Sequence, residues 1–181
     1  MRRRPDRPIP APLVHVRTLV RNLRYWRLKL MLGRKLQVGE NVFFGANTVL
    51  LPPDFARFSK NVAVGRGFHL EANVAVGPDV LFSSHVAIIG NDHSFDDPSS
   101  SIYWQGRNEP SIVYIEGDNL IGFRTTIIGN VRIGKGCIVG ACSVVTTDLP
   151  PNTVCVGAPA RPVRPRFRET TSESALNASA Q

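Results

Sequence analysis

The chain has 181 residues, of which 43% are hydrophobic, so it can form one folded domain and is not grossly disordered. No apolar run approaches the roughly 20 residues that are needed to cross a bilayer. The net charge of +8 is concentrated at one end, because residues 1–35 contain eleven of the 22 Lys and Arg residues and one acidic residue. The rest of the chain has eleven basic and thirteen acidic residues, which argues against a nucleic-acid-binding domain.

The cysteines and the N-terminus suggest a cellular compartment. Cys137, Cys142 and Cys155 form an odd set without metal-ligand spacing, which is typical of reduced thiols in the cytoplasm. The basic start is followed by neither a continuous apolar stretch nor a small-residue cleavage site, so a secretory signal is not predicted. We therefore expect a cytoplasmic protein without a bound metal.

An amphipathic helix is predicted over residues 13–32, within a basic N-terminal arm that spans residues 1–35. Four large apolar side chains recur at helical spacing, while the arginines occupy other angles. Two interpretations remain open. The helix either covers the open end and the unpaired strand edge of the fold that follows, or it lies on an anionic membrane surface. The four apolar residues are Leu19, Leu23, Trp26 and Leu30.

From residue 36 the sequence has a period of six residues. Apolar side chains recur at every sixth position up to Ile88, with one slip of two residues at Pro52-Pro53. A second phase of the same repeat begins at Ile115. Glycine often follows the apolar residue, and a compact or β-branched residue often stands four positions after it. The fifteen apolar positions are Val38, Phe44, Leu50, Phe58, Val64, Leu70, Val76, Phe82, Ile88, Ile115, Ile121, Ile127, Ile133, Val139 and Val145.

This period fits neither an α-helix nor a simple alternating strand. It predicts short strands joined by tight turns, in which three hexads close a triangular coil and stacked coils bury the apolar column. Fifteen hexads give about five coils, more than the three repeats that such folds usually need. A β-sandwich with coincidental spacing is the alternative, and fifteen in-register positions disfavour it. The predicted fold is therefore an all-β parallel β-helix over residues 36–165.

The repeat is interrupted between Ile88 and Ile115, an offset of four hexads plus three residues. This offset predicts a loop over residues 91–114 that leaves the β-helix. Excursions from a rigid scaffold often carry function. His93 lies near the start of this loop, and a neutral histidine is suited to remove a proton from a hydroxyl near pH 7. His93 is therefore the candidate general base.

Residues 36–165 resemble the hexapeptide-repeat acyltransferases. The segment VGACSVVTTDLPPNT, residues 139–153, followed by GAPAR at residues 157–161, resembles the closing signature of the sugar O-acetyltransferases among them. The resemblance implies a left-handed β-helix and a homotrimer whose active site is built across the subunit boundary. It also implies acetyl-CoA as the acyl donor, and a hydroxyl of a sugar or glycan precursor as the acceptor.

The resemblance carries over roles to individual residues. His93 would be the catalytic base, and the backbone near Phe123 would contact the cofactor or the oxyanion. Arg161 and Arg164 would face the nucleotide phosphates, for which guanidinium groups are suited. The expected cofactor-binding residues are Phe123, Ala141, Thr146, Thr147, Arg161 and Arg164.

Acceptor-binding residues are expected in the loop and on the coil beneath it. Asp92 would orient His93 or bind sugar hydroxyls, and Trp104 would stack on a sugar ring. Two positions depart from the family pattern, because Leu120 stands where Trp is frequent and Thr147 stands where a basic residue is frequent. The expected acceptor-binding residues are Glu71, Asn73, Asp92 and Trp104.

Two other functions remain as alternatives. A non-catalytic scaffold would keep the fold, bind partners through the basic arm and ignore acetyl-CoA. A zinc-dependent β-helix carbonic anhydrase would need three histidines across a trimer interface, but His69, His85 and His93 lack the expected spacing. It would also leave the closing signature unexplained. Residues 166–181 are predicted to form a disordered tail.

Overall fold

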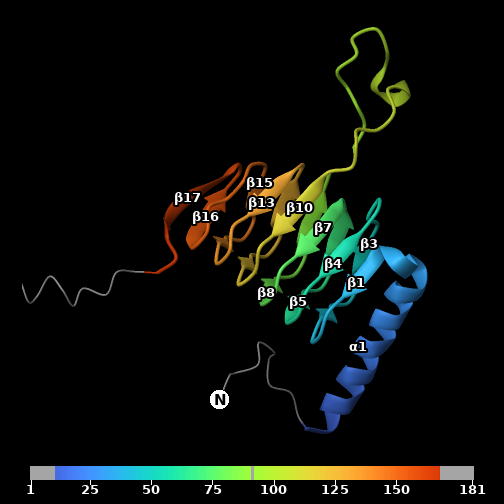
Figure 1. The fold of residues 1–181 in the computed structure, drawn as a ribbon, viewed down its shortest axis with the longest axis vertical. Coiled ribbons are helices and arrows are strands. Elements are labelled where there is room, and N and C mark those ends of the chain that lie inside the picture. Colours follow the sequence, from blue (N-terminus) through green and yellow to red (C-terminus); the bar gives the residue numbers. More distant parts are fainter. Residues whose placement is uncertain (1–10, 91, 168–181) are drawn as a thin grey trace, which may run out of the picture.

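The computed structural model describes residues 11–90 and 92–167, and it contains three sheets wound around one core (Figure 1). We name the sheets A, B and C in the order in which the chain first enters them. Sheet A consists of β1 (Leu36–Val38), β4 (Ala56–Phe58), β7 (Asn73–Val76), β10 (Ile112–Ile115) and β13 (Val131–Ile133). Sheet B consists of β2 (Phe43–Phe44), β5 (Val62–Val64), β8 (Val80–Phe82), β11 (Leu120–Ile121), β14 (Ile138–Val139), β16 (Thr153–Gly157) and β17 (Ala160–Pro165). Sheet C consists of β3 (Val49–Leu50), β6 (His69–Glu71), β9 (Ala87–Ile89), β12 (Thr126–Ile128) and β15 (Val144–Val145).

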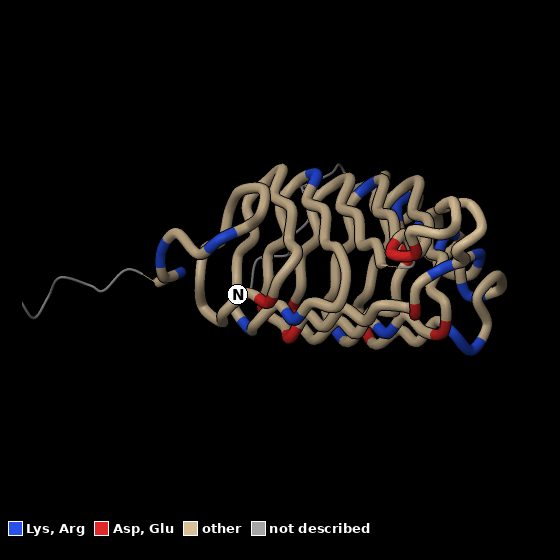
Figure 2. Tube along the Cα trace, turned by 90° about the horizontal axis from the view of Figure 1, so that it is seen from above, with Lys and Arg blue, Asp and Glu red and all other residues tan. Residues whose placement is uncertain are grey.

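Each coil contributes one strand to each sheet, so the five strands of sheets A and C correspond to the predicted number of about five coils. Sheet B extends further with β16 and with β17, which is antiparallel to β16. Seen from above, the coils stack side by side along one axis (Figure 2). The parallel pairing of successive coils confirms the interpretation of the six-residue period as a β-helix.

The register of the sheets follows the hexads. Val62 pairs with Val80, one 18-residue coil further along the chain. The first coil is longer, because Leu36 pairs with Ala56. These two additional residues correspond to the slip that the sequence shows at Pro52-Pro53.

The core is the column of apolar residues that the period predicts. Fourteen of the fifteen positions are buried, and Val38, in the first coil, is half-buried. The ring centroids of Phe44 and Phe58 are 5.2 Å apart in an edge-to-face contact. Truncation of one such buried side chain to alanine generally lowers the free energy of unfolding by about 2–5 kcal/mol, so the column accounts for much of the stability of the β-helix, which we also call the prism.

Two of the three cysteines belong to this core. The Sγ atoms of Cys137 and Cys155 are 3.8 Å apart on neighbouring coils. Burial raises the pKa of the Cys137 thiol to about 12 and also raises the pKa of Cys155. Both thiols therefore stay protonated near neutral pH, and neither is a candidate nucleophile.

Three stacked corners connect the sheets, and we call them the A–B, B–C and C–A corners. Many corner residues have positive φ, and Asn and Asp are frequent there because they tolerate this conformation. In the B–C corner the Cys142 amide donates to the Phe123 carbonyl (2.7 Å), and the Arg124 amide donates to the Ser84 carbonyl (3.1 Å). These bonds align the B–C corner residues in a column parallel to the axis.

Helix α1 (Ala11–Leu32) lies across the first coil and continues into the 3-10 helix η1 (Gly33–Lys35). It ends at Gly33, which adopts the left-handed conformation (φ +54°) that commonly terminates helices. Leu28 is buried against the core, and Tyr25 and Leu32 pack beside it. The helix therefore covers part of the N-terminal end of the prism, which agrees with the first interpretation of the amphipathic pattern.

The residues that form this contact are not the predicted ones. Leu19, Leu23, Trp26 and Leu30 are 60–88% exposed on the side of α1 that faces away from the β-helix. Their apolar row therefore does not cover the open end of the fold. None of the helices in the described residues is long and apolar enough to cross a membrane.

The C-terminal end of the described chain is also tied to the prism. The Arg166 guanidinium donates to the carboxylate of Asp118 (2.6 Å), and the Arg166 amide donates to the Asn152 carbonyl (2.8 Å). Arg166 therefore belongs to the folded part of the chain and not to the predicted tail. Residues 168–181 and 1–10 lie outside the described residues.

Candidate functional site

The loop leaves the prism at the C–A corner, between β9 and β10, and projects away from the coil stack (Figure 1). It is shorter than predicted, because β10 begins at Ile112. Its two legs meet where the Ser111 amide donates to the Gly90 carbonyl (2.8 Å). A Cβ atom at Gly90 would collide with the Ser111 side chain, so glycine is required where the legs meet.

His93 lies just beyond this root. It forms an antiparallel bridge with Arg107 on the opposite leg. The Asn108 amide donates to the Asp92 carbonyl (2.9 Å), and the Asn108 side chain donates to the His93 carbonyl (3.2 Å). The backbone of His93 is thus held by pairing between the legs.

The imidazole of His93 has an available nitrogen. Its Nδ1 atom is shielded from solvent and has no hydrogen-bond partner among the described residues. Buried polar atoms generally have a partner, so this one is a candidate for contact with a ligand or another subunit. The Asp92 carboxylate accepts a hydrogen bond from the His93 amide (2.7 Å), so it fixes the backbone of His93.

The tip of the loop is ordered by its own polar side chains. The Gln105 side chain accepts a hydrogen bond from the Asp97 amide (3.0 Å) and donates to the carbonyls of Asp97 (3.0 Å) and Ser100 (2.8 Å). Hydrogen bonds from the Ser99 hydroxyl and amide lower the pKa of the Asp97 carboxyl. Asp97 therefore stays ionised as a local cap.

The predicted sugar-stacking residue lies in the same loop. Trp104 ends the short 3-10 helix η2 (Ile102–Trp104), and its ring contacts that of Tyr103 edge-to-face at 4.7 Å. Both side chains are 76% exposed. They form an aromatic surface that nothing in the described chain covers.

A second group of candidate residues lies in the B–C corner. Phe123 and Ala141 occupy equivalent positions on successive coils, which the Cys142–Phe123 backbone bond connects. Arg161 pairs with Val156 in the β16–β17 hairpin, which lies at the same end of sheet B. The structure therefore brings Phe123, Ala141 and Arg161 into one column.

His85 belongs to this column and was not among the predicted cofactor-binding residues. Its ring meets the Phe123 ring edge-to-face at 5.8 Å, and its backbone has a positive φ of 61°. The sequence did contain a signal, because His85 occupies the same place in its hexad as Arg124 and Cys142. Those two residues directly follow Phe123 and Ala141.

The other predicted cofactor residues lie elsewhere in the same chain. Thr146 and Thr147 are exposed after β15, at the C–A corner, so they share that corner with the loop root. Arg164 pairs with Val154 near the opposite end of β17 from Arg161. One copy therefore does not gather all six predicted cofactor residues.

Of the two acceptor candidates on the coil beneath the loop, only Glu71 is accessible. Its carboxylate lies 2.7 Å from Nε2 of His69, and the side chains of His69 and Glu71 are 40% and 43% exposed. Asn73 is 2% exposed. Its side-chain oxygen accepts hydrogen bonds from the backbone amides of Asp54 and Phe55 (both 2.9 Å). Asn73 therefore has a structural role in the corner, and we no longer assign it to the acceptor site.

Histidines and acidic residues do not converge on a metal site. No group of three His, Cys, Asp or Glu side chains that could hold an ion is found in residues 11–90 and 92–167. Within one copy His69 lies on sheet C, His85 in the B–C corner and His93 in the loop. The zinc alternative would require these separate places to meet between subunits.

The candidate site has two halves, the loop root with His93 at the C–A corner and the column at the B–C corner. They lie at opposite ends of the sheet C strands. The B–C column lies before β12 and the C–A corner lies after it. About six residues separate the two corners, which corresponds to roughly 20 Å of extended chain. The loop projects away from the stack (Figure 1), and within one copy its root at the C–A corner is separated from the B–C column by the length of the sheet C strands.

Comparison with known proteins identifies the family. Residues 112–147 match the bacterial transferase hexapeptide (six repeats), and residues 35–78 match the hexapeptide repeat of succinyl-transferase. The provisionally named lipopolysaccharide biosynthesis O-acetyl transferase WbbJ of Escherichia coli (strain K12) is 33% identical over 168 residues, covering 85% of each chain. The chain belongs to the hexapeptide-repeat acyltransferase family. Its β-helix is accordingly left-handed, which confirms the predicted fold class.

Solved structures of hexapeptide-repeat acyltransferases share this fold. A maltose O-acetyltransferase from Clostridium difficile 630 is 27% identical, with a TM-score of 0.57 over 78% of this chain and 75% of that chain. AntD, an N-acyltransferase from Bacillus cereus of which a mutant was solved with dTDP and coenzyme A, is 19% identical. Its TM-score is 0.57 over 82% of this chain and 87% of that chain. The chain spans only 45–62% of the length of four further curated relatives, with which it is 30–33% identical.

Proposed function

We propose that this protein is an O-acetyltransferase that transfers the acetyl group of acetyl-CoA to a hydroxyl of a sugar or glycan precursor. The observation that carries the proposal is His93, held at the root of the single loop with a shielded ring nitrogen that has no partner among the described residues. Relatives named as O-acetyltransferases of lipopolysaccharide, galactoside and maltose support a sugar acceptor. Coenzyme A in the AntD structure supports a CoA thioester as donor.

The proposed reaction proceeds by direct attack. The acceptor oxygen forms a bond to the thioester carbonyl carbon while the imidazole of His93 takes the hydroxyl proton. A backbone N–H near Phe123 stabilises the resulting oxyanion. The tetrahedral intermediate then breaks its C–S bond, and the departing CoA thiolate receives the proton from the imidazolium. The products are the acetyl ester and CoA.

The donor is proposed to lie along the B–C corner. Ala141 is exposed there and small enough to let a pantetheine arm approach the backbone. Arg161 lies at the same end of sheet B, and we assign it to the nucleotide phosphates. Thr146, Thr147 and Arg164 lie outside this column, so contacts from them are proposed to come from another copy or from a different part of the cofactor.

We propose a homotrimer, which the separation of the two halves supports. The loop root and the B–C column lie on different corners of one prism, so a complete site needs the loop of one subunit beside the column of its neighbour. Symmetric oligomers commonly build sites across such boundaries. The proposal therefore unites His93 with Phe123 and Ala141 only in the assembly.

The acceptor is proposed to bind between the loop and the exposed carboxylate on sheet C. Glu71 is oriented by His69 and can accept hydrogen bonds from sugar hydroxyls. Trp104 offers an exposed aromatic face for a sugar ring, and Asp92 lies beside His93. Leu120, which replaces a frequent Trp, argues for an acceptor that differs from a simple galactoside.

The reaction is tested by measuring the release of free CoA thiol from acetyl-CoA. Purified protein is expected to release thiol in proportion to added acceptor across a panel of mono- and oligosaccharides. Succinyl-CoA serves as the comparison donor and is expected to be slower. Absence of CoA binding would favour the non-catalytic scaffold, and thiol release with no dependence on any acceptor would contradict acetyl transfer to a sugar.

The exposed apolar row of α1 is proposed to contact an anionic membrane surface. Arg17, Arg21 and Arg24 of the helix face sheet B, but Arg27 is exposed beside the apolar row and the helix has no acidic residue, so a second copy placed against the row would bring like charges together. An anionic lipid surface complements this charge while it covers the apolar side chains. The row has Trp26 near its centre, which is suited to the interface between lipid and water.

Vesicle flotation tests this contact. The protein is expected to float to a greater extent with phosphatidylserine-containing vesicles than with neutral ones, because the exposed Arg27 adds electrostatic attraction. Trp26→Glu is expected to reduce the floated fraction several-fold, whereas Val163→Glu, which charges an exposed residue on β17, should leave it unchanged. If Trp26→Glu changes the mass of the particle in light scattering instead, the row is an interface between copies and the membrane contact is refuted.

A further inference from the structure

The imidazole of His85 is held in place in the middle of the B–C column. The backbone of His85 has a positive φ of 61°, a conformation that recurs at the equivalent position of the neighbouring coils. On one side its ring meets the Phe123 ring edge-to-face at 5.8 Å. On the other side a Cβ atom at Gly67 would lie 2.6 Å from Nδ1 of His85, so the ring occupies the space that a side chain at Gly67 would need. The ring is thus fixed between the coil before and the coil after its own.

This fixed ring is available to a ligand. His85 is exposed, and neither of its ring nitrogens makes a hydrogen bond within residues 11–90 and 92–167. A neutral imidazole has one hydrogen-bond donor and one acceptor, so it can pair with a hydroxyl in either direction. Side chains that are fixed by packing recognise ligands more precisely than mobile ones. His85 therefore has the properties of a binding residue.

The order of residues along the column places His85 relative to the proposed donor. The donor is proposed to extend from Arg161 past Ala141, with its acyl carbon near the Phe123 backbone. The Arg124 amide donates to the Ser84 carbonyl (3.1 Å), so the coil of His85 lies directly beside the coil of Phe123. Neighbouring parallel strands are about 4.8 Å apart, so His85 lies one such step beyond the proposed acyl position. It is therefore on the side from which the acceptor approaches.

The next coil along the axis carries the accessible acceptor candidate. Gly67, against which the His85 ring lies, comes shortly before β6, whose first and last residues are His69 and Glu71. The His69 amide donates to the Val86 carbonyl (2.9 Å), so β6 begins beside the residue that follows His85. Along the axis, the coil of His85 thus lies between the proposed acyl position and the Glu71 carboxylate.

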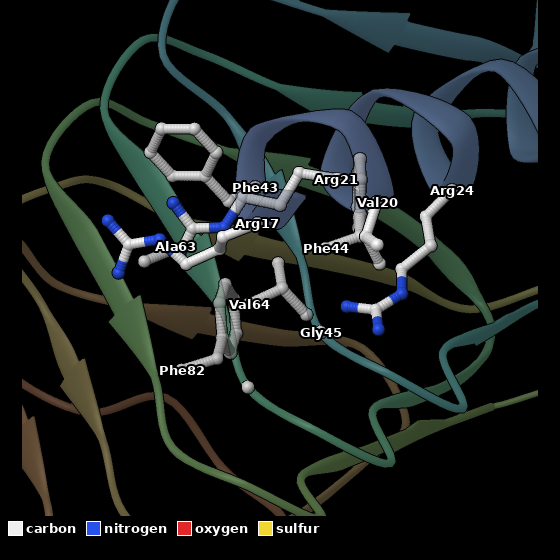
Figure 3. Close-up of a pocket in the computed structure, with 11 residues that line it drawn as sticks. Arg17, Val20, Arg21, Arg24, Phe43, Phe44, Gly45, Ala63, Val64 and Phe82 are labelled. Atoms are coloured by element: carbon white, nitrogen blue, oxygen red, sulfur yellow. The ribbon is translucent and has the colours of Figure 1, made fainter. Parts of the chain in front are cut away.

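Helix α1 limits the column at its N-terminal end. Arg24 of this helix reaches toward Gly45, at the B–C corner of the first coil (Figure 3). Two coil steps separate that corner from the coil of His85, which corresponds to roughly 10 Å along the axis. The part of the acceptor that lies along the corner must fit within this length.

We propose that His85 binds a hydroxyl of the acceptor sugar adjacent to the one that is acetylated. The inference rests on the proposed function and deepens it, because it assigns the acceptor to sugars with two neighbouring hydroxyls. One hydroxyl would be held by the imidazole of His85, while the other faces the acyl carbon and gives its proton to His93 of another subunit. Because Gly67 and Phe123 fix the ring, His85 would determine which hydroxyl is presented.

Steady-state kinetics of two variants test this role. His85→Asn keeps a residue that tolerates positive φ but removes the ring, and it is expected to raise the KM for the acceptor about tenfold through the loss of one hydrogen bond. Gly67→Asn displaces the ring without removing it and should act in the same direction. Both variants are expected to change kcat by less than about threefold and the KM for acetyl-CoA by less than about twofold. His15→Asn, on α1, is the matched control and should behave as wild type.

Monodeoxy analogues of the acceptor separate hydrogen bonding from packing. One analogue is expected to be used equally well by wild type and His85→Asn, because it lacks the hydroxyl that His85 binds. A difference that persists with every analogue would overturn the assignment. So would an unchanged KM for the acceptor, a rise in the KM for acetyl-CoA instead, or a loss of kcat as large as that expected for His93→Ala.

Imidazole NMR spectra of the full-length protein provide a readout that needs no catalysis. The signals of His85 are assigned by their absence in His85→Asn. In protein saturated with CoA, maltose or N-acetylglucosamine is expected to shift them and to leave the signals of His15 unchanged, and no shift with either sugar would overturn the assignment. A shift without thiol release from acetyl-CoA would refute the proposed function and keep the sugar site. Thiol release with a wild-type acceptor KM in His85→Asn would do the reverse.

Discussion

Replacement of His93 by alanine is expected to lower kcat by about 10²–10⁴-fold, the range typical for loss of a general base. The KM for acetyl-CoA should change little, because the donor is proposed to bind along the B–C corner and not at the loop root. The measurement is steady-state release of CoA thiol at saturating acceptor. His93 is anchored through its backbone to Arg107 and Asn108, so removal of its ring should leave the loop in place.

His15→Ala is the matched control, because His15 is exposed on α1 and far from the loop. It is expected to retain wild-type kcat and the same unfolding temperature. Catalysis by His93→Ala at the wild-type rate would refute the proposed base. A loss of kcat that is accompanied by a fall in unfolding temperature would assign His93 a structural role and would also contradict the proposal.

Mixed trimers provide the second large effect. Ala141→Trp should block the donor column, and His93→Ala should remove the base, so each variant alone is expected to be inactive. If the loop of one subunit serves the column of its neighbour, unfolding and refolding an equal mixture should restore sites that contain both native halves. Random assembly gives roughly a quarter of the wild-type activity, since each half is native with a probability of about one half.

Two controls accompany this mixture. A double variant that carries both substitutions, mixed with wild type, should show only the activity of sites whose loop and column both come from wild-type subunits. The separately refolded single variants, combined without unfolding, should stay inactive. No recovery in the mixture, with normal trimers present, would mean that both halves act within one chain and would contradict the shared site.

The six-residue period predicts the β-helix because every sixth residue must be apolar when its side chain points into the core. Positions such as Ile121 and Val139 have no other place to point once coils pair in register, as their direct pairing in sheet B demonstrates. Period alone does not specify handedness, because either hand buries the same column. Membership in the hexapeptide-repeat acyltransferase family supplied it.

Other features depend on contacts that no spacing encodes. The row of Leu19 and Trp26 has the periodicity of a buried face, yet the first coil contacts Leu28 and holds Arg21 over Phe43. Asn73 was expected beside the acceptor, but its amide satisfies two backbone donors inside a corner. In both cases competition among neighbouring groups decides the orientation, and only the folded geometry reveals which group prevails.

The 18-residue register has a further consequence for how such a protein can change during evolution. Insertion or removal of whole coils preserves every strand pairing, whereas shorter changes within a strand place apolar residues on the outer surface, and only corners accept them, as at Pro52-Pro53. The spacing between α1 and any later corner position can therefore vary only in increments of about 4.8 Å. The number of coils between α1 and a later corner thus sets the distance between them along the axis, and a related chain with one coil more or fewer would differ by one whole step.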